Sequence, residues 1–546
     1  MKKIVLFLLM LPGLKAIGQN ATIVFGNEMK TTNLSGATNV VLGNDAEGFF
    51  VLRMEGVDAD DAQSALLQDN PATGLAMTML IGMGVIDEDR RLFDLESYMG
   101  TKNATMFTKV KLFLQKYDNN CNQVWSKQFN LTMGETTLRL KNILYVDGKL
   151  YLFATNYEKN AYKTSIYYTS FNEDGTLSPD FELLDEITGK SPANSNTVNS
   201  YRLNLSSDKS KILLYSNTAD SKGTPDNINL SVYDLTMKLS WKKTYPLSFG
   251  EQKYIITKQM LLNDGNVYLI AKVAPTDAEK KSGVRNKIFL VKGGKDMASC
   301  KNIPLTVTGK TVTDTYLEEE ADNSLKLFGF YSTGSAKKAG GAYVYSIGSD
   351  FTVTKKANKD FTPTVISSIL GDDEGDDDPE IGNIHIRKVF SNTDGTHTLV
   401  AENYVIITNY NNNSFNFTYR YYDASIFRIK DDASVVWSTA VHKKQKSIND
   451  GAKFLSFVSQ DVDGNVVLIF NGHKDDPAKK LTNIDNAKVY VAKVDASGKQ
   501  TVEALFSTKE MDTQAQPKTS YLMNGNEIVL YCMDGLNYRF AKVTLK

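Results

Sequence analysis

Four histidines are the side chains in this chain best suited to acid–base or metal chemistry, because imidazole titrates near neutral pH. They are His385, His397, His442 and His473, all in the last third of the sequence. His385 and His397 are spaced to lie on neighbouring strands of one hairpin. No third ligand stands at metal-binding spacing, and we recognise no Ser/His/Asp set and no phosphate-binding loop. The sequence therefore favours binding over catalysis, and we assign no catalytic residue and no cofactor.

The strongest charge cluster is the acidic segment GDDEGDDDPE at residues 371–380. Calcium at Asp372–Asp378 is one interpretation, since hard cations take several carboxylates. The spacing is not that of an EF-hand, and Pro379 restricts the backbone. A solvated loop and a surface for a basic protein partner are the other interpretations. As partner-binding candidates this segment offers Asp372, Asp373, Asp376 and Asp377.

The segment PATGLAMTMLIGMGVI at residues 71–86 carries no charge and is the second candidate for partner binding. Methionine adapts to irregular contact surfaces, and glycine lets backbones approach closely. A bilayer span needs about 20 apolar residues, so this segment is too short to cross one. It is either extra core or an exposed docking or plugging element. Its candidate contact residues are Leu75, Met77, Met79, Leu80, Ile81, Met83, Val85 and Ile86.

An aromatic strip occurs in FNFTYRYYD, where Phe415, Phe417, Tyr419 and Tyr421 share one face of a predicted strand. With ENYVIITNY before it, the strip forms an unusually long hairpin around residues 411–413. Packing against neighbouring strands is one interpretation, and sugar binding is the other.

These candidates are positioned by a repeat that runs the length of the chain. Its most regular copy, LLNDGNVYLIAKV at residues 261–273, reads as strand, tight turn and strand, with Asp264-Gly265 at the turn. Each unit has four strands, a to d. The repeat predicts an all-β propeller of about eight four-stranded blades, with seven as the alternative. The turns between strands a and b fall near Gly48, Gly148, Asp208, Gly265, Asn323, Gly395, Gly464 and Gly525.

The predicted propeller is a single domain over residues 19–546. Its last unit lacks strand d, and we expect residues 21–25, ATIVF, to supply it and close the ring. The first unit is interrupted between strands b and c by a part-helical insertion at residues 56–104. The insertion, the acidic segment and the long hairpin are all b–c or d–a connections, which emerge on one face of a propeller. Variable loops on a rigid scaffold commonly carry function.

A further mark recurs in KYDNNCNQVWSKQ, VYDLTMKLSWKKT and IKDDASVVWSTA, which place Trp125, Trp241 and Trp437 on strand d. This pattern resembles the repeats of quinoprotein-like eight-bladed propellers, in which such tryptophans pack between blades. That resemblance implies the eight-bladed fold. Members include quinone-dependent dehydrogenases and non-catalytic periplasmic assembly proteins. The dehydrogenases' cofactor and calcium ligands are not matched, so the resemblance implies no catalysis here.

The N-terminus is typical of a secretory signal peptide over residues 1–18: Lys2 and Lys3, a short apolar core, and small residues before Gln19. The formal net charge of -1 gives no general attraction to nucleic acid. Three widely spaced cysteines do not make a disulfide scaffold. We expect a periplasmic or secreted protein without a transmembrane span. The chain ends at the closing strand without a further sorting domain, which favours a periplasmic resident.

Together these features predict a protein–protein interaction module, in particular an accessory, cap or plug subunit of an outer-membrane secretion or assembly complex. The alternative is a carbohydrate-binding or glycan-processing propeller with its site at the central channel, formed by aromatics and paired carboxylates on the a strands.

Overall fold

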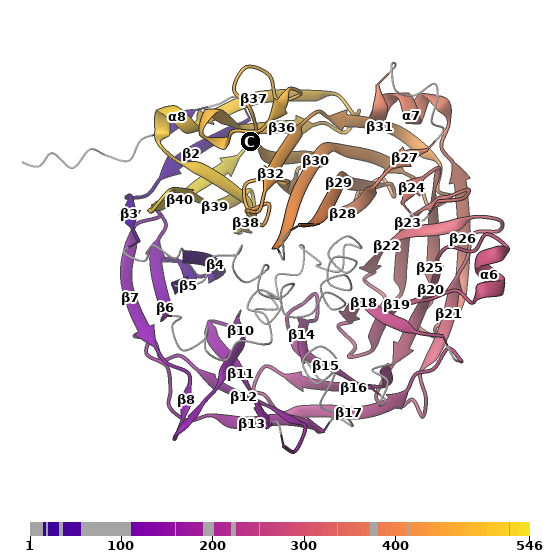
Figure 1. Cartoon of the computed structure of the whole chain (residues 1–546), viewed down its shortest axis with the longest axis horizontal. Coiled ribbons are helices and arrows are strands. Elements are labelled where there is room, and N and C mark those ends of the chain that lie inside the picture. The colour runs from indigo at the N-terminus through magenta and orange to yellow at the C-terminus, as the bar shows by residue number, and fades with distance from the viewer. Residues whose placement is uncertain are drawn as a thin grey trace, which may run out of the picture.

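The computed structural model describes residues 15–17, 20–31, 37–55, 111–158, 160–188, 201–219, 225–250, 252–335, 337–371, 380–411, 414–523 and 525–546. Eight sheets stand around a common axis, and each contributes four antiparallel strands to a β-propeller (Figure 1). The predicted all-β, eight-bladed fold is confirmed, and the seven-bladed alternative is wrong. Among the described helices, none is long and apolar enough to cross a membrane.

The first four blades are regular meanders in which strand a is innermost and strand d outermost. Blade 1 contains β4 (Ala37–Asn44), β5 (Gly48–Glu55), β6 (Lys111–Asp118) and β7 (Gln123–Phe129). Blade 2 contains β10 (Arg139–Val146), β11 (Lys149–Glu158), β12 (Lys163–Ser170) and β13 (Glu182–Thr188). Blade 3 contains β14 (Arg202–Leu205), β15 (Lys211–Ala219), β16 (Pro225–Asp234) and β17 (Leu239–Pro246). Blade 4 contains β18 (Tyr254–Leu261), β19 (Val267–Val273), β20 (Lys287–Gly293) and β21 (Lys301–Leu305).

The second half repeats this order, with additions in blades 6 and 8. Blade 5 contains β22 (Thr311–Glu319), β23 (Leu325–Ser332), β25 (Gly341–Ile347) and β26 (Val353–Asp360). Blade 6 contains β28 (Ile384–Ser391), β29 (His397–Asn411), β30 (Ser414–Ile429) and β31 (Val435–Val441). Blade 7 contains β33 (Phe457–Val462), β34 (Asn465–His473), β36 (Ala487–Val494) and β37 (Gln500–Ser507). Blade 8 contains β38 (Gln514–Leu522), β39 (Glu527–Asp534), β40 (Asn537–Leu545) and β2 (Ala21–Phe25).

Short elements join or extend the blades. The helices are α6 (Asp277–Lys281), α7 (Pro363–Leu370), α8 (Thr508–Met511) and the 3-10 turn η2 (Ile484–Asn486). The short strands are β1 (Lys15–Ile17), β3 (Met29–Lys30), β8 (Thr132–Met133), β9 (Thr136–Thr137), β24 (Lys338–Ala339), β27 (Ile381–Gly382), β32 (Lys444–Ile448) and β35 (Lys480–Leu481).

The two ends of the chain meet in blade 8. Strand β2 pairs antiparallel with β40, with Ala21 opposite Leu545 and Phe25 opposite Ala541. β1 adds one further strand outside β2, pairing Lys15 with Val24. Because β1 falls within the predicted signal peptide, cleavage before Gln19 would remove β1 and leave the β2–β40 pairing in place.

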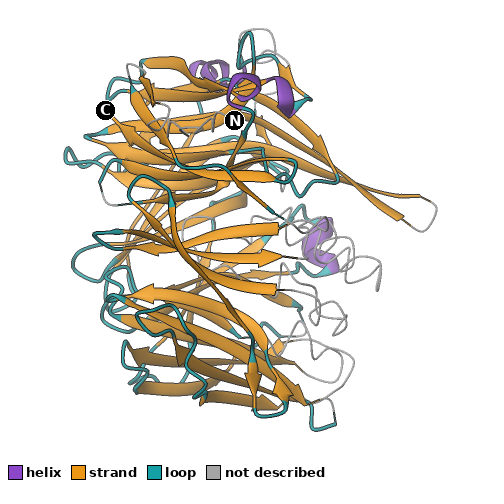
Figure 2. Cartoon of the chain, turned by 90° about the vertical axis from the view of Figure 1, so that its left-hand side faces the viewer, coloured by secondary structure: helices purple, strands orange, loops and turns teal. Residues whose placement is uncertain are grey.

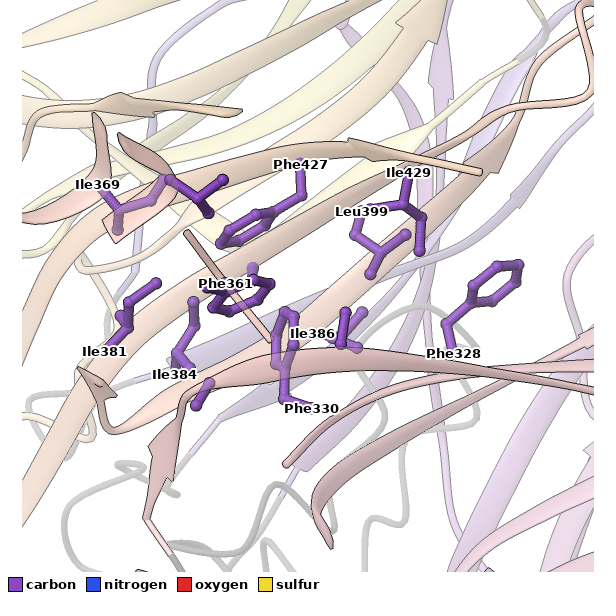
Figure 3. Packing of buried hydrophobic residues seen from close by; sticks show 14 of the residues in the cluster. Phe328, Phe330, Phe361, Ile369, Ile381, Ile384, Ile386, Leu399, Phe427 and Ile429 are labelled. Atoms are coloured by element: carbon purple, nitrogen blue, oxygen red, sulfur yellow. The ribbon is translucent and has the colours of Figure 1, made fainter. Parts of the chain in front are cut away.

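Packing between blades forms the core, because neighbouring sheets stack their apolar faces. Figure 3 shows the contact of blades 5 and 6, where Phe330, Phe361 and Phe427 meet. The Phe361 and Phe427 rings stack with centroids 5.3 Å apart. Helix α7 closes this cluster with Ile369, which is 2% exposed. Thr362 caps the helix by accepting a hydrogen bond from the Val365 N–H, and Pro363 occupies its first turn.

The three tryptophans lie on strand d, as the sequence pattern predicts. Two of them rest against a glycine of the following blade. A Cβ on Gly175 would lie 2.4 Å from Trp125, and one on Gly498 would lie 2.9 Å from Trp437. These tryptophans therefore pack between blades, and a glycine is required where their rings approach the next backbone.

The two faces of the ring differ in their connections. Short turns join strands a to b and c to d on one face, called the a–b face. Asp147 and Gly148 both have positive φ, which matches the type I′ turn that a two-residue hairpin favours. The opposite face, called the b–c face, carries α6 and the β29–β30 hairpin, which extends well beyond the other blades (Figure 2).

Candidate functional site on the b–c face

The partner-binding residues predicted from the sequence lie outside the described residues. This holds for Leu75 to Ile86 within the insertion and for Asp372 to Asp377, together with the calcium interpretation of the acidic segment. Glu380, at the end of that segment, is buried. It accepts hydrogen bonds from the Ser332 hydroxyl (2.7 Å) and the Thr333 N–H (2.6 Å). Burial alone would raise the Glu380 pKa, but these hydrogen bonds hold it below its usual value.

The long hairpin is the most prominent described feature of the b–c face. β29 has 15 residues and β30 has 16, and their register shifts between Glu402 and Tyr404. The residues before Glu402 on β29, and their partners on β30, belong to blade 6. The residues from Tyr404 to Tyr421 form an extension, 404–421, which gains a third strand where β32 pairs with β30. The irregularity at Glu402 therefore marks the point where the hairpin leaves the blade.

A buried ionic network occupies this point. Glu402 accepts from Arg387 at 2.8 Å, from Lys443 at 2.6 Å and from the Ser456 hydroxyl at 2.7 Å. The side chains of Glu402 and Lys443 are both fully buried. Burial would raise the Glu402 pKa, but the neighbouring Lys443 and Arg387 charges hold it below its usual value. Glu402 is therefore an ionised anchor with its oxygens already occupied, and it is unsuited to proton transfer.

The network extends through three blades by way of amide side chains. Gln445 donates to the Asn471 carbonyl at 2.7 Å and accepts from the Ser456 N–H at 2.8 Å. Asn471, on blade 7, donates to the Ala515 carbonyl of blade 8 at 2.8 Å. The base of the hairpin is thus fixed to two following blades, which orients the extension relative to the ring.

A series of aromatic contacts links the innermost strand of blade 6 to the extension. His385 lies 4.8 Å from Tyr404 between ring centroids, and Tyr404 lies 5.2 Å from Tyr421. Lys518, on the innermost strand of blade 8, donates to the Tyr421 hydroxyl at 2.6 Å. The extension therefore leans over blade 7 toward the inner edge of the ring.

The aromatic strip predicted from the sequence faces inward. Phe417, Tyr419 and Tyr421 are 2–3% exposed and pack with Ala452 and Leu455. Of the two interpretations of the strip, packing is the correct one for these rings. His385, beside Tyr404, has its pKa lowered to about 4 because burial disfavours the charged imidazole. It is neutral at pH 7.

A Ser/His/Asp set, which the sequence did not reveal, lies at the other end of the same hairpin. The Ser391 Oγ is 2.9 Å from His397 Nδ1, and His397 Nε2 is 3.1 Å from Asp431 Oδ1. Ser391 and His397 face each other across the β28–β29 pair, flanking the Gly395 turn. Cross-strand pairing around a recognised turn is the signal that could have located them.

Two further side chains, Glu318 and Lys326, contact this set. Ser391 also donates to Glu318 Oε1 at 2.9 Å, and Lys326 lies 3.3 Å from His397 Nε2. Burial raises the Glu318 pKa to about 7, so its charge changes near neutral pH. An ionised Glu318 accepts the hydrogen bond of the Ser391 hydroxyl. The hydroxyl hydrogen is then not available to His397, as a general base would require. The set is therefore a hydrogen-bond network rather than an activated nucleophile.

The four histidines do not converge. His385 pairs with Glu402 across the β28–β29 ladder, and His397 pairs with Ser391. His442 contacts Asp423, and His473 accepts a hydrogen bond from the Asp475 N–H. Within the part of the chain that the structure describes, no group of three or more His, Cys, Asp or Glu side chains is arranged to hold a metal ion. All three cysteines are free.

No protein-family model matches the sequence, and a search of curated proteins finds no match. Among solved structures, the chain is similar to the polysaccharide lyase Uly1 (11% identity, 77% of this chain and 92% of the other, TM-score 0.33). It is also similar to a protein of unknown function from Dyadobacter fermentans (10% identity, 75% and 95%, TM-score 0.28). A Synechocystis apocarotenoid oxygenase mutant matches at 10% identity over 97% and 94%, with a TM-score of 0.30. Similarities at this level carry no argument about function, and none supports the quinoprotein-like label.

Proposed function

We propose that this protein is an exported periplasmic propeller that works by protein–protein binding through its b–c face. In its specific form it is an accessory subunit of an outer-membrane secretion or assembly complex, and the Leu75–Ile86 segment caps or plugs a pore. Residues 56–110 connect strands b and c of blade 1, between β5 and β6. The β29–β30 hairpin connects the same two strands in blade 6. Both connections therefore belong to one face by topology.

The observation that carries the proposal is the braced extension of blade 6. The ring is complete without residues 404–421, since the blade's own pairing ends at Asn403. A buried ion pair is a poor source of stability, because desolvation offsets most of its attraction. It does fix orientation, and here Glu402, Lys443 and Arg387 fix the direction of the extension. A projecting hairpin with a rigid base and no part in ring closure is suited to contact another protein.

The outer side of the extension offers a mixed apolar and basic surface. On the central strand, Thr418 lies between Ile407 on one neighbouring strand and Ile448 on the other. Arg420 lies in the same way between Val405 and Lys446. Ile448 is 56% exposed. An exposed isoleucine with half-buried apolar neighbours and nearby cations fits a partner with an apolar patch and an acidic rim. This chemistry describes the partner that we expect on the b–c face.

A crosslinking experiment in cells that express the tagged full-length protein tests the proposal. A photo-crosslinking amino acid replaces either Ile448 or Val436, which is 49% exposed on the outer strand of the same blade. We expect one outer-membrane protein to crosslink at position 448 and not at 436. We also expect its recovery to fall at least tenfold in the Ile448→Glu/Arg420→Glu variant and on deletion of residues 56–104.

Equal crosslinking at the two positions would contradict the proposal for the hairpin. Unchanged recovery after deletion of residues 56–104 would show that the insertion is not a docking element. Thermal unfolding of each variant shows that a lost partner does not reflect a lost fold.

A further inference from the structure

One edge of the long hairpin has no strand beside it. On the side of the innermost strand of blade 6, β28 pairs with β29 only as far as Asn403, which lies opposite Ile384. On its other side, β29 pairs with β30 as far as Asn411. Within the part of the chain that the structure describes, no strand pairs with residues 405–411 on the β28 side. This stretch, called the β29 edge, projects beyond the ring with the rest of the hairpin (Figure 2).

The β28–β29 ladder ends because the segment before β28 turns away from β29. Asn383 has a positive φ of 49°, and its N–H donates to the Lys337 carbonyl at 2.6 Å. The two residues before it, Ile381 and Gly382, form β27 and pair with β24 instead. The last backbone hydrogen bond on this side runs from the Tyr404 N–H to the Asn383 carbonyl at 3.1 Å. The fold of the neighbouring segment therefore leaves the β29 edge unpaired.

Two hydrogen bonds show which backbone groups face this edge, because successive residues of an antiparallel strand bond to opposite neighbours. The Tyr404 N–H donates toward the β28 side, and the register is regular beyond Tyr404, so Ile406 and Thr408 direct their backbone groups the same way. On β30, the Phe417 carbonyl accepts from the Asn449 N–H, away from β29. Phe417 lies opposite Thr408, so both strands give the same assignment. The N–H and C=O groups of Ile406 and Thr408 therefore face the β29 edge.

The β29 edge lacks the devices that usually protect an edge strand, which are charge, proline and a covering element. Its sequence over residues 405–411, VIITNYN, has no charged residue and no proline. By contrast, the outermost strand of blade 5, β26, carries three lysines, and β21 of blade 4 carries Pro304. In blade 6, helix α7 packs against the uncharged outer strand β31. On the other side of the extension, β32 carries two lysines and pairs in part with β35.

The outer face of the extension indicates which side chains an added strand should carry. Val405 stands in one cross-strand row with Arg420 and Lys446, and Ile407 stands in the row that ends at the exposed Ile448. Val405 and Ile407 are half-buried. Because the first row holds two cations, an acidic residue beside Val405 would complement its charge. An apolar residue beside Ile407 would continue the second row.

The inner face of the same edge borders an apolar cluster. Ile406 lies opposite Tyr419 and packs against the buried cluster that contains Phe417, Tyr419 and Tyr421. Ile406 itself is only half-buried, since nothing described pairs with its strand on the edge side. An aromatic or aliphatic residue beside Ile406 would therefore extend the cluster and remove more of Ile406 from water.

We propose that the partner of the b–c face binds by adding an extended strand to the β29 edge, antiparallel to β29. In this strand an acidic residue lies opposite Val405, an aromatic or aliphatic residue opposite Ile406 and an apolar residue opposite Ile407. Backbone pairing supplies affinity in such strand addition, and the alternating side chains supply specificity. The inference rests on the proposed function, because it names how the partner of that face is held.

Binding of a designed peptide to the purified full-length protein tests the edge without knowledge of the partner. The peptide carries the central sequence TVIFE, which in an antiparallel register places Glu, Phe and Ile opposite Val405, Ile406 and Ile407. We expect saturable binding by fluorescence anisotropy and slower hydrogen exchange over residues 405–411. A peptide with N-methyl groups on its Phe and Val lacks the N–H groups that pair with Ile406 and Thr408, and it should bind at least tenfold more weakly.

Ile406→Pro and Ile406→Val form a matched pair of protein variants. Proline removes the N–H that faces the β29 edge and leaves the hydrogen bonds between β29 and β30 in place, whereas valine keeps the N–H. We expect Ile406→Pro to weaken binding of the TVIFE peptide at least tenfold and Ile406→Val to bind it like the wild type. Urea unfolding of both variants checks that the fold is retained. The inference is overturned if the TVIFE peptide does not bind, if its N-methylated form binds equally well, or if the two variants bind alike.

The crosslink at position 448 separates this inference from the proposed function. Loss of the crosslink in Ile406→Pro but not in Ile406→Val supports strand addition by the partner itself. A crosslink that persists in Ile406→Pro contradicts strand addition and leaves binding through the b–c face in place. If the TVIFE peptide binds the β29 edge but no protein crosslinks at position 448, the edge accepts a strand and the proposed function is wrong.

Discussion

Glu318 shows how one buried carboxyl group can make stability depend on pH. Its Oε2 atom has no hydrogen-bond partner among the described residues, while Oε1 accepts from Ser391. Burial raises its pKa to about 7. The folded protein therefore holds a proton that the unfolded chain releases near pH 4.5. Stability should fall as pH rises from about 4.5 to 7, because the unfolded state binds fewer protons in this window.

Glu318→Gln should remove this dependence, because glutamine keeps an acceptor for Ser391 and does not titrate. Relative to the wild type, we expect the variant to gain about 2 kcal/mol in free energy of unfolding between pH 5 and pH 8. Urea unfolding at the two pH values measures the difference. Glu135→Gln, at an exposed carboxyl, is the control. Parallel pH profiles for the wild type and Glu318→Gln would contradict the assignment.

Glu402 and Lys443 should respond unequally to mutation. Replacing Glu402 with Gln leaves Arg387 and Lys443 as buried cations with no carboxylate between them, whereas Lys443→Met leaves Glu402 still paired with Arg387. We expect Glu402→Gln to cost about 3–5 kcal/mol and Lys443→Met about 1–3 kcal/mol in unfolding free energy.

Denaturant unfolding distinguishes these values. Asp277→Asn provides a reference, because it breaks the exposed pair of Asp277 (89% exposed) with Lys280 (54% exposed) and should change the unfolding free energy little. Equal costs for Glu402→Gln and Asp277→Asn would show that the network does not brace the hairpin.

At the scale of elements, the strands and their turns were predictable, and several contacts between them were not. Asp-Gly turns and alternating apolar residues identify most a–b hairpins because both signals are local. Helix α7 was missed because its PTVISSIL sequence is rich in β-branched residues, and its burial against Phe427 decides its conformation. The Ser391–His397–Asp431 set was missed because Asp431 reaches it from the next c–d turn.

The long hairpin likewise has features that the sequence predicts and others that it does not. Its length and the shared face of Phe417, Tyr419 and Tyr421 follow from strict alternation in the sequence. The direction of the hairpin does not follow from the sequence. It depends on Glu402 and Lys443, which are 41 positions apart, and on Lys518, which lies two blades further on.

At the scale of the whole molecule, the ring is held closed by the pairing of β2 with β40. Ala21, Ile23 and Phe25 are 0–5% exposed and belong to the apolar cluster of blades 7 and 8, whereas Thr22 and Val24, which alternate with them, are half-buried. The Phe25 ring meets Phe506 of blade 7 with centroids 5.2 Å apart. A few N-terminal residues thus cover the edge of β40 and part of the contact between blades 7 and 8.

Removing β2 should therefore destabilise the entire ring. Ile23→Ala and Phe25→Ala should each cost about 2–5 kcal/mol in unfolding free energy, as is usual for truncating a buried apolar side chain. Thr22→Ala/Val24→Ala should cost less, because these side chains are only half-buried. A chain that begins at Gly26 exposes the β40 edge and should self-associate, whereas one that begins at Gln19 should stay monomeric. Light scattering and urea unfolding measure both effects. A synthetic peptide of residues 19–25 should restore the truncated chain, because β2 is connected to blade 8 through backbone pairing. If the chain that begins at Gly26 is as stable and as monomeric as the one that begins at Gln19, closure by β2 does not hold the propeller together.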